Sequence, residues 1–439
     1  MRSTQVLGRT ARLAATALAA VSMVTACGGG GDDAADKTPP KTTQDKRAPR
    51  PVHDPPRKFA MKAGTVIPKE ATTGRLTGGR LDEDLPVALY RQTAFVAAPD
   101  AVLAVDTVTG KTVKRLTPKG APFQDEAEKL ANTTPAAAPL VVQDGKQSAV
   151  VAPFLVKVTG SGTQASHTAA EVTGVDATSA RRLWSMPIRL PKWVSETTSQ
   201  VTAAVVGSVD GTVVVSVAAS DQAVSYGLDM DARRLLWTKP DYRAKTVAGR
   251  TMVGESITDV GTHRRAVGYD AVSGRDLWKG VDSDSLEIQG AGPHLVTAYG
   301  SEYDSGDRYA QLLDARNGSV KAKLTDGPSS RTCRYDAKDT LVCGGLGTTQ
   351  QEATALDART GKTLWRLPDQ SADRIAPKVT AVWHGCVYGT TDSGAVVLNA
   401  RSGEDVSARA GAAPVLVNES VGLALDKRGD QLMAYPTTG

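Results

Sequence analysis

Three of the four cysteines lie in the C-terminal half of the chain, and two of them have a spacing that suits a disulfide. Cys333 and Cys343 flank residues 335–339, a turn-forming stretch that would place them within reach of each other on adjacent strands. A disulfide there would close a small loop and stabilise the fold by about 2–3 kcal/mol. Cys386 is then expected to be a buried strand residue, and a bridge between Cys343 and Cys386 is the competing pairing.

The other residue types that catalyse reactions or bind metals form no motif with the required spacing. The five histidines are scattered, and no two have the separation of zinc ligands. The chain contains neither a Gly-x-Ser-x-Gly nucleophile motif nor a phosphate-binding loop. Asp282, Asp284, Asp304 and Asp307 could bind a cation, but nothing fixes their mutual distances, so solvated loops are expected. The sequence therefore predicts no catalytic residues, no metal site and no cofactor.

One phrase recurs along the chain, and residues 355–365 give its clearest form. It reads as a strand, a tight turn and a return strand. The carboxylate of Asp357 can accept N–H groups of the turn, and Gly361 supplies the positive φ that closes the turn. Trp365 ends the return strand with a large apolar surface to bury. The turn position recurs at Asp106, Asp176, Asp229, Asp270, Asp314, Asp357 and Asn399, and tryptophan follows eight residues later at Trp184, Trp237, Trp278 and Trp365.

The spacing of these copies predicts the fold. The later copies follow one another at intervals of about 40 to 50 residues, the length of a four-stranded propeller blade. A set of unrelated hairpins with similar turns is the alternative. A last unit, residues 414–435, has three candidate strands and no turn phrase, so a strand from residues 60–90 is expected to complete it. We predict an all-β fold, a β-propeller of four-stranded antiparallel blades over residues 61–439, with eight blades and seven as the alternative.

The charge of the chain argues against a nucleic-acid partner. The formal net charge is +5, and Arg2, Arg9 and Arg12 supply three of the positive charges from the N-terminal segment. The remainder is close to neutral, whereas domains that bind nucleic acids carry a concentrated positive surface.

The N-terminus has the composition of an export signal. Residues 1–26 begin with basic residues and continue in an apolar stretch that is too short to span a bilayer. The stretch ends in Val24-Thr25-Ala26-Cys27, which resembles the lipobox of bacterial lipoproteins. This resemblance implies cleavage before Cys27 and attachment of diacylglycerol to its thiol. An ordinary secretory signal peptide is the alternative.

Residues 27–60 are rich in Gly, Pro and charged residues and have too little apolar surface to fold. Because prolines favour extended conformations, we expect a disordered tether that holds the folded domain off the membrane. Its basic residues could contact anionic lipid headgroups, but a solvated linker is favoured. The protein is therefore expected at the extracytoplasmic face of the cell membrane, anchored by its lipid.

The phrase Leu-Asp-Ala-x-Thr-Gly-Lys-x-x-Trp at 356–365, with a copy at 269–278, resembles the repeat of pyrroloquinoline-quinone (PQQ) type β-propellers. The resemblance covers about residues 85–436. It implies that the tryptophans of the repeat pack between neighbouring blades and lock the ring. The residues that match this role are Trp184, Trp237, Trp278 and Trp365, whereas Lys114, Ala322 and Ser407 stand where tryptophan would be.

The resembling family has two functional branches. Quinoprotein dehydrogenases hold PQQ and Ca²⁺ and commonly carry a disulfide between adjacent cysteines, and this chain has no adjacent cysteine pair. The other branch consists of non-catalytic lipoproteins and sensor domains, and the lipobox and tether fit this branch. The Ala-, Gly-, Arg-, Asp- and Thr-rich composition resembles that of proteins from GC-rich actinobacteria.

We therefore expect a non-catalytic, monomeric binding or scaffold module with a protein partner in the cell envelope. Loops on one rim are expected to form the contact, including insertions near residues 120–135, with a helix at 126–130, and near 300–308. A PQQ-dependent quinoprotein oxidoreductase and the ligand-sensing domain of a signalling system are the alternatives.

Overall fold

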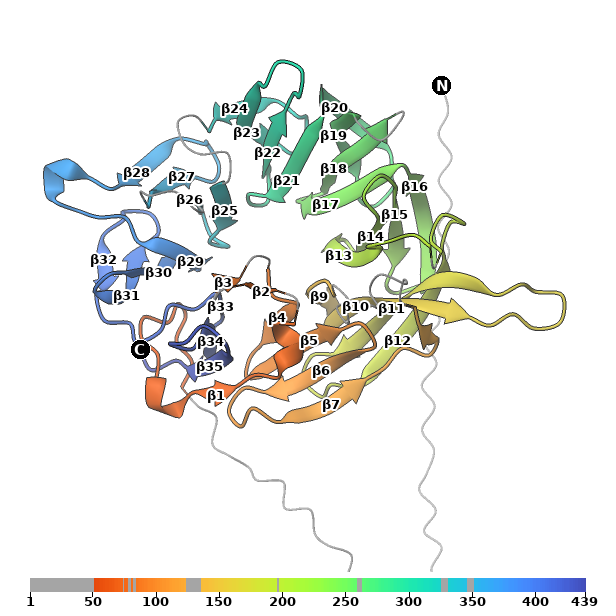
Figure 1. Ribbon diagram of the computed structural model, residues 1–439, viewed down its shortest axis with the longest axis horizontal. Helices are drawn as coiled ribbons and strands as arrows, with labels where there is room; N and C mark the ends of the chain where they lie inside the picture. Colours follow the sequence, from red (N-terminus) through yellow and green to blue (C-terminus); the bar gives the residue numbers. More distant parts are fainter. Residues whose placement is uncertain are drawn as a thin grey trace, which may run out of the picture. The chain divides into compact units, whose positions relative to one another are not determined.

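The computed structural model describes residues 51–73, 75–77, 80–81, 84–123, 136–195, 197–258, 263–324, 331–345 and 351–439. Within these ranges the chain forms eight antiparallel sheets that surround a common axis as the blades of a propeller (Figure 1). The predicted all-β propeller of eight blades is therefore confirmed, and the alternative of seven blades is excluded. The signal peptide 1–26, Cys27, the tether before residue 51 and the helix expected at 126–130 lie outside the described residues.

Each of the first four blades contains four strands that follow one another along the chain. In blade 1 these are β4 (Val87–Tyr90), β5 (Thr93–Ala98), β6 (Ala101–Asp106) and β7 (Thr112–Leu116). Blade 2 contains β9 (Leu140–Asp144), β10 (Gln147–Val158), β11 (His167–Asp176) and β12 (Arg182–Arg189), and the short β8 (Ala121–Pro122) pairs with β10. Blade 3 contains β13 (Thr202–Val209), β14 (Thr212–Ala218), β15 (Ala223–Asp229) and β16 (Arg234–Pro240), and blade 4 contains β17 (Tyr242–Ala248), β18 (Thr251–Thr258), β19 (His263–Asp270) and β20 (Asp276–Ser283).

The remaining blades repeat this pattern. Blade 5 contains β21 (Ser285–Gly290), β22 (Leu295–Ser301), β23 (Arg308–Asp314) and β24 (Val320–Lys323), and blade 6 contains β25 (Arg331–Tyr335), β26 (Thr340–Gly345), β27 (Ala353–Asp357) and β28 (Thr363–Leu367). Blade 7 contains β29 (Lys378–Trp383), β30 (Cys386–Thr391), β31 (Gly394–Asn399) and β32 (Asp405–Ser407). Outside the blades lie the hairpin of β2 (Leu76–Thr77) and β3 (Arg80–Leu81) and the 3₁₀ turns η1 (Met61–Ala63), η2 (Lys69–Ala71) and η4 (Gln370–Ala372).

Blade 8 closes the ring with strands from both ends of the described chain. Its strands β33 (Leu416–Val417), β34 (Val421–Leu425) and β35 (Leu432–Pro436) are completed by β1 (Thr65–Val66). In the β1–β35 ladder, Thr65 lies opposite Ala434 and Val66 lies opposite Met433. The prediction that a strand from residues 60–90 completes the last unit is therefore confirmed.

The hydrophobic core lies in the seams between blades. Among the described residues, the buried apolar side chains form eight clusters, and each cluster joins two neighbouring blades. A central strand is therefore covered on both faces, as β14 shows, since all seven of its residues are buried. Valine and threonine suit this environment because β-branched side chains pack well on a pleated surface.

Three of the repeat tryptophans close their seams by direct contact with the next blade. Trp278 donates its indole N–H to the carbonyl oxygen of Ala315, the residue after Asp314 in blade 5, at 2.7 Å. The ring lies between two glycines, because a Cβ on Gly268 would be 2.2 Å from its Nε1 and a Cβ on Gly318 would be 2.5 Å from its Cε3. The equivalent bonds join Trp237 to Ala271 at 3.0 Å and Trp365 to Ala400 at 2.8 Å.

The turn residue of each repeat organises the backbone that follows it. Oδ1 of Asp357 accepts the N–H groups of Arg359 and Thr360 at 3.1 and 2.9 Å, and Asn399 accepts the corresponding two N–H groups of its own turn. The same kind of side-chain bond to one or both N–H groups is present at Asp106, Asp176, Asp229, Asp270 and Asp314. Each turn thus presents its backbone to the preceding blade in a fixed conformation.

The propeller begins earlier than the predicted boundary at residue 61. Phe59 is 5% exposed, forms a β-bridge with Thr437 and packs edge-on against Tyr388 at 6.0 Å between ring centres. The hydroxyl of Tyr388 donates to the carbonyl oxygen of Pro56 at 2.8 Å. The prediction of a disordered tether through residue 60 is therefore wrong for residues 51–60, which we call the strap. The ring of Phe59, the contacts of Tyr388 with Pro56 and of His384 with Asp54, and backbone bonds to blades 7 and 8 hold it.

Replacing Gly318 tests the indole contact. Gly318→Ala is expected to lower the free energy of unfolding by about 2–4 kcal/mol, because it combines left-handed strain at φ 71° with overlap on Trp278. The matched control is Gly145→Ala, at φ 62° with no atom within 4 Å of the added Cβ, which should cost only about 1 kcal/mol of strain. Denaturant unfolding measures both, and equal losses would contradict the contact.

The strap provides a second test. Phe59→Ala is expected to lower the free energy of unfolding by about 3 kcal/mol, since it removes a buried ring. Hydrogen exchange of the amides of Arg57, Lys58 and Thr438, which bond across the strap, should become faster. Val52→Ala, at a side chain 63% exposed, should change stability by less than about 0.5 kcal/mol. Unchanged exchange in the Phe59 variant would show that the strap is not held there.

Candidate functional site

The seam between blades 2 and 3 departs from the arrangement at the other tryptophan seams. Trp184 donates its indole N–H at 3.0 Å to Oδ2 of Asp144, within its own blade. Arg233 of the blade 3 turn occupies the position at which five other copies have glycine, with φ 54°. Its guanidinium lies over the indole of Trp184, with Cζ 4.7 Å from the ring centre, and Nη2 lies 3.2 Å from Oδ2 of Asp144.

Because Arg233 stands in place of glycine, the turn of blade 3 cannot approach the indole of Trp184 as closely as a glycine turn would. Between blades 3 and 4, a Cβ on Gly274 would lie 2.8 Å from Cγ of Trp237, so that contact requires a residue without a side chain. Because Arg233 carries a side chain, blade 3 meets Trp184 through a cation–π contact and an ion pair instead. The outer part of this seam is consequently open.

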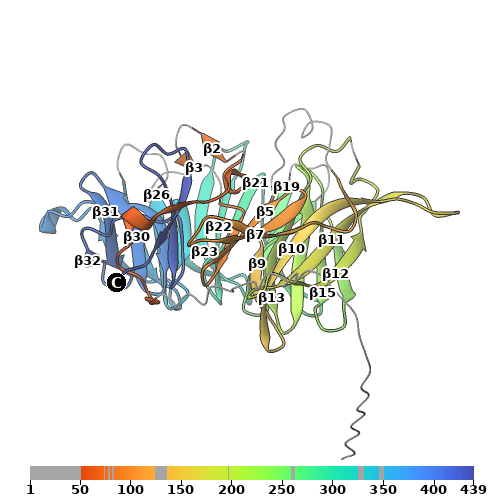
Figure 2. The same cartoon turned by 90° about the horizontal axis from the view of Figure 1, so that it is seen from below.

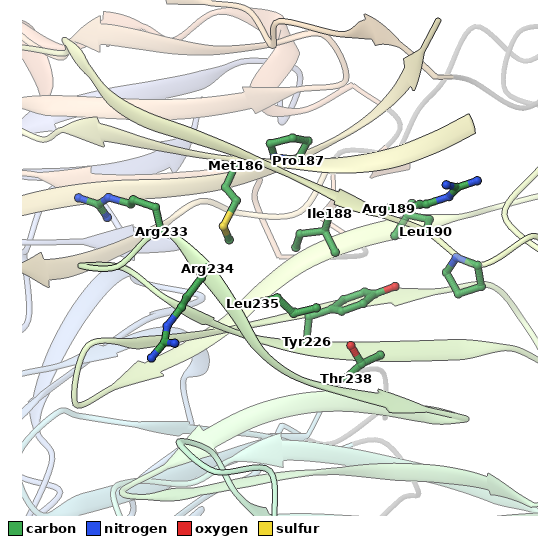
Figure 3. A pocket seen from close by; sticks show the side chains of 11 residues that line it. Met186, Pro187, Ile188, Arg189, Leu190, Tyr226, Arg233, Arg234, Leu235 and Thr238 are labelled. Atoms are coloured by element: carbon green, nitrogen blue, oxygen red, sulfur yellow. The ribbon is translucent and has the colours of Figure 1, made fainter. Parts of the chain in front are cut away.

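The opening is a groove of about 590 Å³ between the outer strands β12 and β16 (Figure 3). Its apolar part comes from Met186, Ile188 and Leu190 on one side and from Tyr226 and Leu235 on the other. Tyr226 is 3% exposed at the floor, whereas Leu235 is 47% exposed. The groove therefore offers a concave apolar surface to a ligand.

The charged lining of the groove is entirely basic. Its charged members are Arg189, Arg233 and Arg234, and no acidic residue lines it. Arg233 is held by Asp144, and Arg234 lies 3.7 Å from Asp229 with 69% of its side chain exposed. Arg189 is exposed and forms no ion pair with the described part of the chain.

The two more exposed arginines lie at opposite ends of the groove. Arg189 is the last residue of β12 and Arg234 is the first residue of β16, and both strands follow a repeat turn in the same direction. Ile188, Leu235 and Tyr226 lie between them (Figure 3). The site thus combines an apolar centre with a positive charge at each end.

The cysteines and the loops predicted from the sequence lie elsewhere, whereas the predicted Trp184 and Asp229 contact two arginines of the groove. Cys333 and Cys343 face each other across β25 and β26 and form a disulfide, with Cα atoms 4.0 Å apart. The competing pairing with Cys386 is not present, since Cys386 is a buried free cysteine, and burial raises the pKa of its thiol. Of the loops expected to bind, residues 124–135 lie outside the described residues, and the 300–308 loop belongs to blade 5, away from the groove.

The groove was not predicted, although a signal for it exists in the sequence. Four residues after the turn aspartate, the copy at Asp229 has Arg233. At the same position, the copies at Asp270 and Asp314 have Gly274 and Gly318. The seam can therefore be recognised in the sequence: blade 2 has the repeat tryptophan, and the turn of blade 3 has no glycine to pack against it.

The residues that would hold PQQ and Ca²⁺ are not evident in the described part of the chain. No three His, Cys, Asp or Glu side chains in the described ranges are grouped closely enough to hold a metal ion. The described residues therefore do not assemble the side-chain donors that a Ca²⁺ site beside the quinone would need.

Over the same ranges, no helix has the length and hydrophobicity of a transmembrane span.

No protein-family model and no curated protein matches the chain. Among solved structures, the computationally designed Ika8 protein is similar over 80% of this chain and 95% of its own, with 14% identity and a TM-score of 0.46. The Dos1 propeller matches 62% of this chain and 75% of its own, with 12% identity and a TM-score of 0.37. Hydrazine synthase of Kuenenia stuttgartiensis matches 74% of this chain and 99% of its own, with 16% identity and a TM-score of 0.40.

The buried phenol of Tyr226, at the floor of the groove, makes the free energy of unfolding depend on pH in the alkaline range. Burial raises the pKa of Tyr226 to about 12, whereas the phenol of the unfolded chain titrates near 10. Between these values only the unfolded state loses the proton, so stability falls as the pH rises. Tyr226→Phe removes this effect, so the wild type should lose about 1 kcal/mol more than the variant between pH 8 and pH 11. Urea unfolding at both values measures this, and equal losses would contradict a buried neutral phenol.

Proposed function

We propose that the protein is a lipid-anchored, extracytoplasmic β-propeller that binds a protein partner of the cell envelope through the groove between blades 2 and 3 and catalyses no reaction. The groove carries the proposal. A concave surface that contains a methionine, a tyrosine and arginines has the composition of a protein–protein contact, in which these residue types are enriched.

The rigidity of the groove supports binding. Its walls are β12 and β16, whose backbones are fixed by ladders to β11 and β15. Little ordering is needed when a partner binds to such a surface, so less of the interaction energy is lost. The β10–β11 hairpin belongs to the same sheet as β12 and projects outward from the ring (Figure 2), which adds surface beside the groove.

The position of the strap leaves the groove accessible. The N–H of His53 donates to the carbonyl oxygen of Glu419, and Arg57 and Lys58 bond to Gly439, so the strap joins the ring at blades 7 and 8. The groove lies between blades 2 and 3, in another sector of the ring (Figure 1). A membrane anchor at Cys27, as the lipobox implies, would therefore not require the partner to compete with the strap for the same sector.

Site-specific crosslinking in intact cells tests the proposal. A photo-reactive benzoylphenylalanine at position 235 of the full chain is expected to give a discrete adduct with one envelope protein. The matched control is position 277, a leucine 45% exposed on β20, the outer strand of blade 4, which should give none. The same adduct at both positions, or none at 235, would contradict the assignment of the groove.

Two further measurements address the anchor and the absence of catalysis. Cys27→Ala is expected to abolish incorporation of labelled fatty acid and to release the protein from membranes.

Reconstitution with PQQ and Ca²⁺ is expected to give neither stoichiometric binding nor dye-linked oxidation of alcohols or sugars. Turnover in that assay would contradict the proposal of a non-catalytic binding module and favour a quinoprotein oxidoreductase.

A further inference from the structure

We infer that the groove binds an extended acidic segment of the partner, in which an apolar side chain lies between two carboxylates at alternate positions. This inference rests on the proposed function and specifies the chemistry of the partner. Its basis is the order of groups along the groove, with Arg234 at one end, Leu235, Tyr226 and Ile188 in the middle, and Arg189 at the other end.

The shape of the groove selects an extended segment. Its walls are two outer strands of eight and seven residues, and the lining residues follow one another along each strand. In an extended peptide every second side chain points to the same face. A pattern acidic-x-apolar-x-acidic therefore places three side chains into the groove and leaves the intervening ones in solvent.

The two end arginines are available to new carboxylates. Arg189 pairs with no carboxylate of the described residues, and the contact of Arg234 with Asp229 is long, at 3.7 Å, and exposed. Exposed ion pairs of this kind contribute little, so an incoming carboxylate can displace the contact. A guanidinium binds a carboxylate through two parallel hydrogen bonds, which fixes orientation as well as charge.

Arg233 does not supply a third such site. Its guanidinium is already occupied by Asp144 and by the ring of Trp184. It therefore forms part of the wall, and the apolar side chain of the ligand is expected to cover Leu235 beside it. Covering Leu235 removes its exposed apolar area from water, whereas Ile188 and Tyr226 beneath it are already buried.

An anionic lipid is the competing occupant of a basic apolar groove. A lipid has one charged end and an apolar chain, which would satisfy one arginine and leave the other without a partner. A peptide with two carboxylates satisfies both ends. The arrangement therefore favours a peptide, and lipid binding becomes an outcome of the test.

The test uses the full chain in detergent and a fluorescent peptide with the core Glu-Thr-Leu-Thr-Glu. Fluorescence anisotropy is expected to show saturable binding, and a peptide with lysine in place of both glutamates should bind at least about tenfold more weakly. Arg189→Glu and Arg234→Glu are each expected to raise the Kd of the acidic peptide at least about tenfold. The double variant should instead prefer the lysine peptide, which also shows that it is folded.

The matched control is Arg275→Glu. Arg275 follows the turn glycine of blade 4 as Arg234 follows Arg233 in blade 3, and it lies outside the groove. Its substitution should leave the Kd unchanged. Equal binding of the two peptides, unchanged binding by both groove variants, or arginine-dependent binding to phosphatidylglycerol vesicles without peptide binding would overturn the inference.

These outcomes are distinct from failure of the proposed function. If crosslinking at position 235 captures a partner while neither peptide binds, the groove is a contact surface and the acidic segment is wrong. If the acidic peptide binds and crosslinking captures nothing, the chemistry of the groove is as inferred and the envelope partner is wrong.

Discussion

Each seam of the ring must bury the faces of two twisted sheets, and at three seams the flat indole of the repeat does this by lying between two backbones. At Trp278 a glycine of its own blade supports one face of the ring, and the turn glycine of the next blade covers the other. The indole N–H then bonds to the carbonyl that follows the turn aspartate. At this seam, sheet spacing, turn conformation and hydrogen bonding thus depend on one contact.

Departures from this contact explain the differences between seams. Ala180 keeps the positive φ of the turn, 52°, although it is not glycine. It can do so because blade 1 has Lys114 where a tryptophan would stand, so no indole excludes its methyl group. At Arg233 the preceding tryptophan is present, and the side chain lies across the ring. The seam with Arg233 in place of the turn glycine is the one that contains the groove.

The fold could be predicted because it depends on short-range signals that recur. Asp357, Gly361 and Trp365 define a turn and its return strand within eleven residues, and the interval between copies then determines the blade. The strap could not be predicted in the same way, because Phe59 is a single aromatic residue among prolines and its partners, Tyr388 and Thr437, are more than three hundred residues away. The groove also arises between blades, so no single stretch of sequence contains it.

Closure through β1 and β35 has a consequence for how the chain can fold. The strand β1, which completes blade 8, is synthesised before the other strands of the blades, and its partner β35 is synthesised after blades 1 to 7. Until then, the early blades have an uncovered seam face with no neighbour, unlike the ends of a solenoid that are capped locally. The ring can therefore close only after β35 has been synthesised, and until then the growing chain must keep that apolar face protected.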